Sequence, residues 1–170
     1  MTIIVGGSVV INSSGTVSGE NVPVMYFDIA SNPSLPLTST PQLISGWTQV
    51  IPSVGVSVSD GSITFSESGI LQVSLERVYQ NNDQNPTLVV EVDVDVRKNG
   101  VSLFSQKNII STATNINEPA IASFTSVGIR EISTDDSFEI YISATDGVTE
   151  PQSTLLKSIR MVGNLIHNPR

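Results

Sequence analysis

Alternation of apolar and polar residues is the feature that most constrains the fold of this chain. In residues 88–100, "LVVEVDVDVRKNG", valine stands at every second position and acids stand between the valines. The segments 54–65, 70–76 and 138–143 alternate in the same way. Because successive side chains of a strand point to opposite faces, this period of two predicts half-buried β-strands.

Turn signals separate the alternating segments. Asp60-Gly61 and Asn99-Gly100 each lie between two such segments, and these dipeptides favour tight two-residue hairpin turns. The last long segment, residues 154–166, alternates less cleanly, and we expect it to be buried on both faces. No segment longer than one turn indicates a helix. About eight to ten strands at this spacing predict an all-β fold, an antiparallel β-sandwich or jelly roll.

The length of 170 residues is enough for one domain with a sizeable core. Within it, we place a soft boundary after residue 41. Residues 1–41 are expected to form an N-terminal hairpin, over 8–19, followed by a Pro-rich connection, and residues 42–170 the main sandwich domain. Two interpretations of the N-terminal region stay open: a hairpin that completes the sandwich, or an arm that lies across a neighbouring subunit or surface.

Composition and charge exclude several classes of partner. The net charge of −8 repels a phosphate backbone, so we expect no nucleic acid partner. No apolar run approaches the roughly 18 residues that cross a bilayer, so we expect no membrane contact, and "MTIIVGGSVVI" shows no secretion signal. The absence of cysteine excludes disulfides, thiolate metal sites and thiol nucleophiles.

Glu91, Asp93 and Asp95 are the most conspicuous candidate site residues. Two apart on a strand, they lie about 7 Å from one another on one face. One interpretation is a solvated outer face, where Arg97 and a cross-strand Lys107 offset the repulsion. Another is a calcium site, since calcium accepts several carboxylates. A third is that the charges keep the strand from pairing with strands of other protein chains.

Other candidate residues favour structural roles. "STDDS", residues 133–137, fits a calcium loop, but such clusters more often make a tight turn through side-chain to backbone hydrogen bonds. Trp47 is expected in the core, with a position at a ligand-binding rim as the alternative. His167 is the single histidine and is expected in a solvated tail, which argues against a Ser-His-Asp triad. We therefore predict no enzyme, no catalytic residues and no cofactor.

Four stretches, in order, resemble the tumour necrosis factor-like jelly roll, the family that includes complement globular heads. They are "DGSITFSESGILQVSLE", "VDVRKNGVSL", "REISTDDSFEIYISA" and "SIRMVGNLI". The resemblance covers roughly residues 45–166. Asp135-Asp136 stands where the family has Gly-Asp, and the aromatic residues that often stack near the family's trimer axis are sparse.

The resemblance implies a compact homotrimer that binds or coats and does not catalyse. Such modules occur in secreted ligands, on spore surfaces and in bacteriophage particles. With neither signal nor cysteine, we expect a phage virion protein assembled in the host cytoplasm, either a capsid decoration protein or a fibre knob, with the capsid or fibre protein as partner. The alternative is a receptor- or carbohydrate-binding head of a tail fibre or of a bacterial or spore surface protein.

Overall fold

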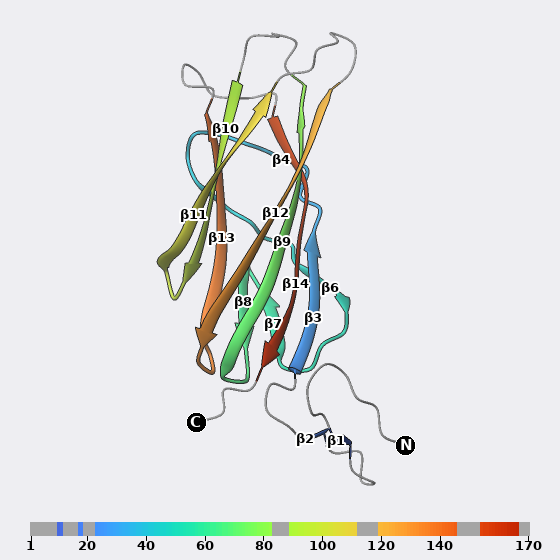
Figure 1. Cartoon of the computed structure of the whole chain (residues 1–170). Helices are drawn as coiled ribbons and strands as arrows, with labels where there is room; N and C mark the ends of the chain where they lie inside the picture. Colours follow the sequence, from blue (N-terminus) through green and yellow to red (C-terminus); the bar gives the residue numbers. More distant parts are fainter. Residues whose placement is uncertain are drawn as a thin grey trace.

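The computed structural model describes residues 10–11, 17–18, 23–82, 89–111, 119–145 and 154–166, and all regular structure in these ranges is β-strand. Two six-stranded antiparallel sheets pack face to face, and a two-stranded sheet stands apart from them (Figure 1). This part of the chain holds no helix that is long and apolar enough to span a membrane. The predicted all-β sandwich is confirmed.

The strand bounds are as follows. The first sheet, which we call the β10 sheet, has the order β11 (Val101–Ser111), β10 (Val89–Lys98), β13 (Ser137–Thr145), β8 (Ser62–Phe65) and β7 (Val56–Ser59), with β5 (Gln42–Leu43) beside β13. The second, the β9 sheet, has the order β12 (Ala120–Ile132), β9 (Gly69–Asn81), β14 (Thr154–Ile166), β3 (Pro23–Ser31) and β6 (Thr48–Ile51), with β4 (Leu35–Pro36) beside β14. The small sheet pairs β1 (Val10–Ile11) with β2 (Val17–Ser18).

The connections between the strands define a jelly roll. The chain changes sheet from β8 to β9, from β9 to β10, from β11 to β12, from β12 to β13 and from β13 to β14. This repeated crossing between two antiparallel sheets is the jelly-roll arrangement. It leaves β11 and β12 as the terminal strands of their sheets, one above the other along the same side of the sandwich.

The core follows the alternation of the sequence. Val90, Val92 and Val94 are fully buried, while the acids between them face outward. At the other end of the core, Phe65 makes edge-to-face contacts with Phe27 and Phe138, with ring centroids 5.3 and 5.7 Å apart. Aromatic pairs prefer this geometry because the ring edge is positive and the ring face negative.

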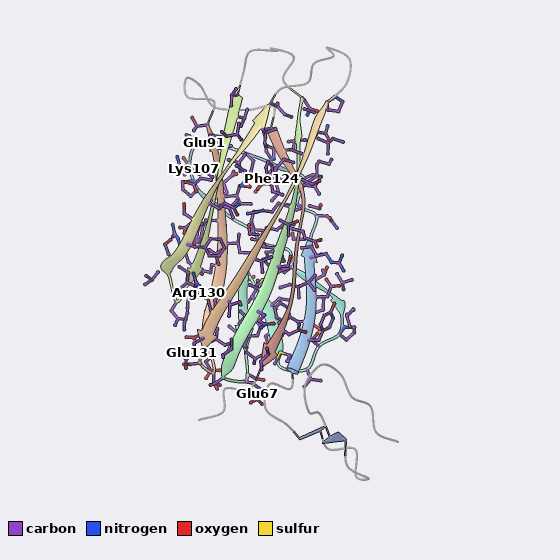
Figure 2. All side chains as sticks on the ribbon, viewed as in Figure 1. Glu67, Glu91, Lys107, Phe124, Arg130 and Glu131 are labelled. Carbon is purple, nitrogen blue, oxygen red and sulfur yellow. The ribbon has the colours of Figure 1, made fainter. Side chains whose placement is uncertain are left out.

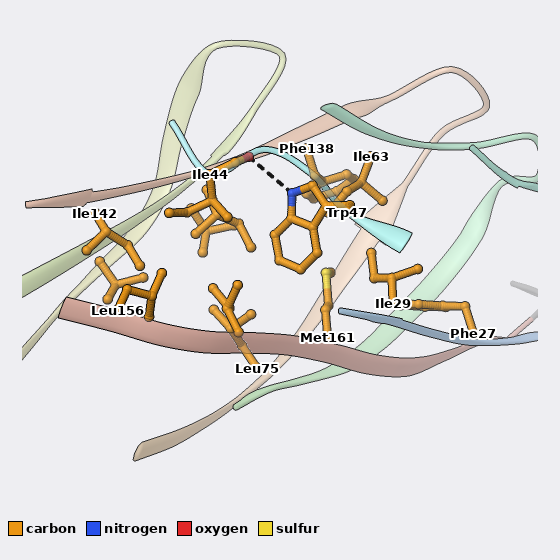
Figure 3. Close-up of a cluster of buried hydrophobic side chains, with 14 of the residues drawn as sticks. Phe27, Ile29, Ile44, Trp47, Ile63, Leu75, Phe138, Ile142, Leu156 and Met161 are labelled. Atoms are coloured by element: carbon orange, nitrogen blue, oxygen red, sulfur yellow. Dashed lines mark hydrogen bonds between the residues drawn. The ribbon is translucent and has the colours of Figure 1, made fainter. Parts of the chain in front are cut away.

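Trp47 is in the core, as predicted. Its side chain lies among the aliphatic residues of both sheets, and its indole Nε1 donates a hydrogen bond of 3.1 Å to the backbone oxygen of Ile44 (Figure 3). Burial of the ring therefore leaves no unpaired indole N–H.

Both predicted hairpin turns are present. Asp60 and Gly61 join β7 to β8 with φ values of 49° and 89°, and Asn99 and Gly100 join β10 to β11 with 52° and 79°. Two consecutive residues with positive φ are the signature of the type I′ turn, whose twist matches that of the flanking strands. One boundary was wrong: Val54 is not in β7 but 96% exposed before it.

The boundary expected after residue 41 is also wrong. β3 pairs with β14 along most of its length and places Phe27 and Ile29 in the core, so residues 23–41 belong to the sandwich. The two-stranded pairing of β1 with β2 matches the hairpin expected over residues 8–19. The other residues of 1–22 lie outside the described ranges.

The uneven alternation of residues 154–166 has a local cause. The register of β14 against β9 shifts between Leu156 and Ser158, so that one extra residue changes which positions face the core. A β-bulge of this kind resets the period of two. β14 buries one face fully and the other only partly, which corrects the expectation that both faces are buried.

Candidate functional site

The acidic strand β10 is neutralised by neighbouring bases. Glu91 pairs with Lys107 of β11, and this hydrogen bond raises the pKa of the lysine (Figure 2). Asp95 accepts a hydrogen bond of 2.7 Å from Arg97 Nε, which raises the pKa of the arginine. The expectation that Lys107 and Arg97 offset the repulsion between the acids is confirmed.

Hydroxyl groups complete the surroundings of the acids. Ser105 Oγ donates to Asp93 at 2.9 Å, and Ser102 Oγ donates to Asp95 at 2.5 Å. In the described ranges, no three acidic or histidine side chains lie close enough together to hold a metal ion. The geometry favours the solvated outer face, and the calcium site at Glu91, Asp93 and Asp95 stays the untested alternative.

A shallow hollow of about 190 Å³ opens beside these acids. Its lining consists of Pro41, Asp93, Asp95, Ser102, Ser105, Tyr141 and Ser143, four of which carry hydroxyl groups. The Arg97 guanidinium lies 4.0 Å from the centroid of the Tyr141 ring, so one face of that ring is already covered. The hollow presents carboxylates and hydroxyls, the groups that hydrogen-bond to sugars.

The "STDDS" segment is a tight turn, as favoured by the sequence. Asp136 accepts a hydrogen bond from the backbone N–H of Ser133 at 2.7 Å, and Asp135 has a φ of 67°. Burial alone would raise the pKa of Asp136, but hydrogen bonds from Lys98, Ser133 and Asn99 outweigh it and lower the pKa. The carboxylate is thus fully used in holding the turn. The other candidate, His167, lies outside the described residues.

The largest feature that could bind a partner is the outer face of β12, β9, β14 and β3, which we call the neutral face. On β12, Ile121, Val127 and Ile129 point outward and are 69%, 79% and 56% exposed. Partly exposed apolar side chains continue across the face. They are Tyr26, Ile70, Val78, Leu155, Val162 and Ile166.

The register of the strands brings these side chains together. Val127 lies opposite Ser74, which lies opposite Val162, and the row below joins Ile129 to Gln72. From strand spacing and rise, the face measures about 15 by 35 Å, on the order of 500 Å². Polar residues such as Ser74 and Gln72 lie between the apolar ones, and exposed apolar side chains gathered on one face are typical of an interaction surface.

The strands as a whole carry no net charge. The strands carry seven acids and seven bases, so the net charge of −8 belongs to the residues between and beyond them. On β12, the ten residues from Ala120 to Ile129 carry no charge, and Arg130 and Glu131 follow at its lower end (Figure 2). Two copies of this face can therefore approach one another without net repulsion.

Sequence reasoning missed one buried charge. Arg77, on β9, is 1% exposed and points between the sheets. Leu71 and Leu75 share its strand face, so the period of two already places residue 77 inward. The signal was in the alternation, although charged side chains are seldom fully buried.

Comparison with known proteins gives little beyond the fold. No protein-family model matches the chain, and no curated protein matches it. Among solved structures, it is similar to the Eiger tumour necrosis factor of S. frugiperda, at 11% identity over 86% of this chain and 96% of that chain, with a TM-score of 0.49. At this level the likeness concerns the fold alone. The strand order independently defines an all-β jelly roll, consistent with the resemblance to the tumour necrosis factor-like class.

Proposed function

We propose that this protein is a non-enzymatic, homotrimeric structural component of a bacteriophage particle, either a capsid decoration protein or a fibre knob. The observation that carries the proposal is the neutral face, with Val127 79% exposed at its outer strand. A stable interface needs about 800 Å² from each partner, and this face alone supplies more than half of that area.

A second copy of the chain is the partner that fits best. β11 and β12 end their sheets on the same side, and Ile109 of β11 is 65% exposed there. A long apolar edge strand is prone to pairing with other chains unless it is covered. If the edge of one copy packs on the neutral face of the next, the contact is heterologous, and such contacts close into a ring when the rotation between copies is a whole fraction of a turn. Three copies make the proposed trimer.

Mass measurement in solution tests the assembly. The chain of 18.1 kDa should give a particle of about 54 kDa by light scattering at micromolar concentration. Val127→Glu should convert it to a monomer with an unchanged circular dichroism spectrum, because a carboxylate cannot be buried without a partner. Val54→Glu is the matched control: Val54 is 96% exposed and lies between β6 and β7, outside the four strands of the neutral face, so this variant should stay trimeric. A monomeric wild type would contradict the proposal.

The proposed role in a virion is tested separately from the trimer. A chain without cysteine needs no oxidising compartment to assemble, which supports assembly in a bacterial cytoplasm. A decoration protein should bind emptied heads of the phage stoichiometrically, and its deletion should leave host adsorption nearly intact. Absence of the protein from purified particles would rule out the virion role while leaving the trimer standing.

A second candidate function is a receptor- or carbohydrate-binding head. The hollow beside Asp93, with its serine hydroxyls and Tyr141, favours it. Such a head should adhere to host cells on its own, and Ser105→Ala together with Ser102→Ala should reduce that adhesion. Equal adhesion by wild type and variant would argue against this hollow as the receptor site. Hydrolysis of a glycan or ester by the pure protein would contradict both proposals.

A further inference from the structure

The interior of the sandwich holds a guanidinium with no charged hydrogen-bond partner. Arg77 Nη2 donates to Gln106 Oε1 at 3.3 Å and to Ser126 Oγ at 2.5 Å, and both acceptors are neutral. Arg77 Nε and Nη1 are buried without a hydrogen-bond partner. The ion pairs of the described residues use other bases: Arg97, Lys98, Lys107 and Arg160.

Other buried polar groups without a hydrogen-bond partner lie near Arg77, two residues further along the strands. β9 and β11 run in the same direction in Figure 1, and Arg77 of β9 contacts Gln106 of β11. Two residues further along each strand, Tyr79 and Asn108 also point inward. The Tyr79 hydroxyl and both polar atoms of the Asn108 amide are buried without a hydrogen-bond partner.

Apart from the Asn108 amide oxygen, which is an acceptor, these unpaired groups are hydrogen-bond donors. Burial, only partly opposed by the nearby Arg77, raises the pKa of Tyr79 to about 12, so its hydroxyl keeps its proton at neutral pH. Guanidinium, phenol O–H and amide N–H groups all present hydrogen toward an acceptor. A buried charge is tolerated only when it is paired, so the group that completes this set must be negative and must accept several hydrogen bonds.

On the β12 side of the core, small side chains lie near Arg77 and Tyr79. Ala122 and Ser126 flank Phe124 at inward positions, and Gly128 follows them. In the register the small Ala122 lies opposite Tyr79, which leaves room on this side of the core for a compact acceptor.

We propose that the sandwich binds a small inorganic anion of halide size between β9, β11 and β12, held by Arg77 Nε and Nη1 with the Tyr79 hydroxyl and the Asn108 amide. The anion is a structural ligand of the folded chain. It is independent of the neutral face, so its test succeeds or fails whatever the oligomeric state.

Thermal unfolding in different salts tests the site. A ligand that binds only the folded state raises the melting temperature with its concentration. When the chloride concentration is 100 times the dissociation constant of chloride at this site, Tm should be roughly 5 to 10 °C higher than in sodium gluconate of equal ionic strength. Gluconate is too large for the core and controls for screening. An equal Tm in both salts would overturn the proposal.

Two variants and one direct observation complete the test. Arg77→Met replaces the guanidinium by an apolar chain and should abolish the difference between chloride and gluconate. If that variant does not fold, Tyr79→Phe should still reduce the difference. Crystals of the wild type grown in sodium bromide should show an anomalous peak within hydrogen-bond distance of Arg77. An Arg77→Met variant with an unchanged chloride response, or crystals without the peak, would show that the orphaned donors bind water and not an anion.

Discussion

Arg160 of β14 donates two hydrogen bonds to Asp28 of β3, from Nε to Oδ1 at 2.9 Å and from Nη2 to Oδ2 at 2.6 Å. Asp28 is 1% exposed although its strand position faces outward, because the guanidinium covers it. The pair joins β3 to β14 and neutralises an acid on the β3 side of the neutral face. Fork-shaped pairs of this kind combine charge with fixed geometry.

The pair predicts a loss of stability in acid. The Arg160 hydrogen bond, against the opposing effect of burial, lowers the pKa of Asp28 below 3.8. As pH falls, the Asp28 carboxyl takes up a proton in the unfolded chain before it does so in the folded chain. The contribution of the ion pair to stability is therefore complete above pH 3.8 and is lost as pH falls through the lower pKa of the folded state. Asp28→Asn should lower the free energy of unfolding at pH 7 by about 1 to 3 kcal/mol and flatten its decline in acid.

The control for this prediction is Asp60→Asn, at an exposed turn position. Denaturant unfolding measured from pH 7 down to about pH 2 compares the three proteins. An Asp28→Asn variant with the wild-type acid profile would show that the ion pair adds nothing to folding.

Asn99 predicts a second effect, on the lower end of the β10 sheet. Its Nδ2 donates to Asp136 Oδ1 at 2.8 Å, and its Oδ1 accepts from the backbone N–H of Ser137 at 2.8 Å. Asn99→Ala loses both bonds and puts a methyl group at a φ of 52°, so the free energy of unfolding should fall by about 1 to 3 kcal/mol. Asn99→Gly should lose less, because glycine accepts this φ.

Asp60→Gly provides the matched comparison for Asn99. Asp60 has the same place in the other type I′ turn, but among the described residues its side chain bonds only to Ser59, at 3.4 Å. This variant should change the unfolding midpoint little. If Asp60→Gly and Asn99→Gly lower the free energy of unfolding equally, the hydrogen bonds from Asn99 to the Asp136 turn contribute nothing to stability.

What the sequence predicted well is local. The alternation around Val92 fixed a strand and its buried face, and the turn residues at 60–61 and 99–100 fixed two hairpins, because each depends on a few neighbouring residues. The boundary after residue 41 was wrong because β3 and its partner strand β14 lie far apart in the sequence. Its pairing with β14 joins Asp28 to Val162, and no local pattern in a Gly-, Ser- and Pro-rich region reveals a partner so distant in the sequence.

The neutral face could not be read from the sequence for the same reason. Val127 and Val162 are ordinary outward residues of their own strands, and single exposed apolar residues are common. They become one surface only through the register that places both beside Ser74. Arg77 differs, since its inward position was readable from Leu75. What it contacts, in Gln106 and Ser126, depended on the packing of the two sheets.

Calcium should have little effect on stability. Glu91 is paired with Lys107, and Asp93 and Asp95 accept hydrogen bonds from serine hydroxyls, so a cation would have to displace these partners. We expect the same Tm in millimolar calcium chloride as in calcium-free buffer of equal chloride concentration. A saturable rise in Tm that disappears in Asp93→Asn would instead establish the cation site at the three acids.

Gly163 predicts a strong effect of a single methyl group. It lies in β14 where a Cβ would meet the backbone oxygen of Gln72 and come 2.7 Å from Cζ of Phe27. The neighbour is backbone on one side and a buried ring on the other, so neither can move without cost, and overpacking of this kind costs about 1 to 3 kcal/mol or more.

Gly163→Ala should therefore lower Tm by at least roughly 3 °C. Gly128→Ala is the matched variant on β12, where the new Cβ would find Val73 at an ordinary 3.6 Å. It should leave Tm unchanged or raise it slightly, because alanine loses less backbone entropy than glycine on folding. Calorimetry of the two variants beside the wild type measures the difference. Equal Tm values for both would mean that β9 and β14 do not approach as closely at Gly163 as this structure has them.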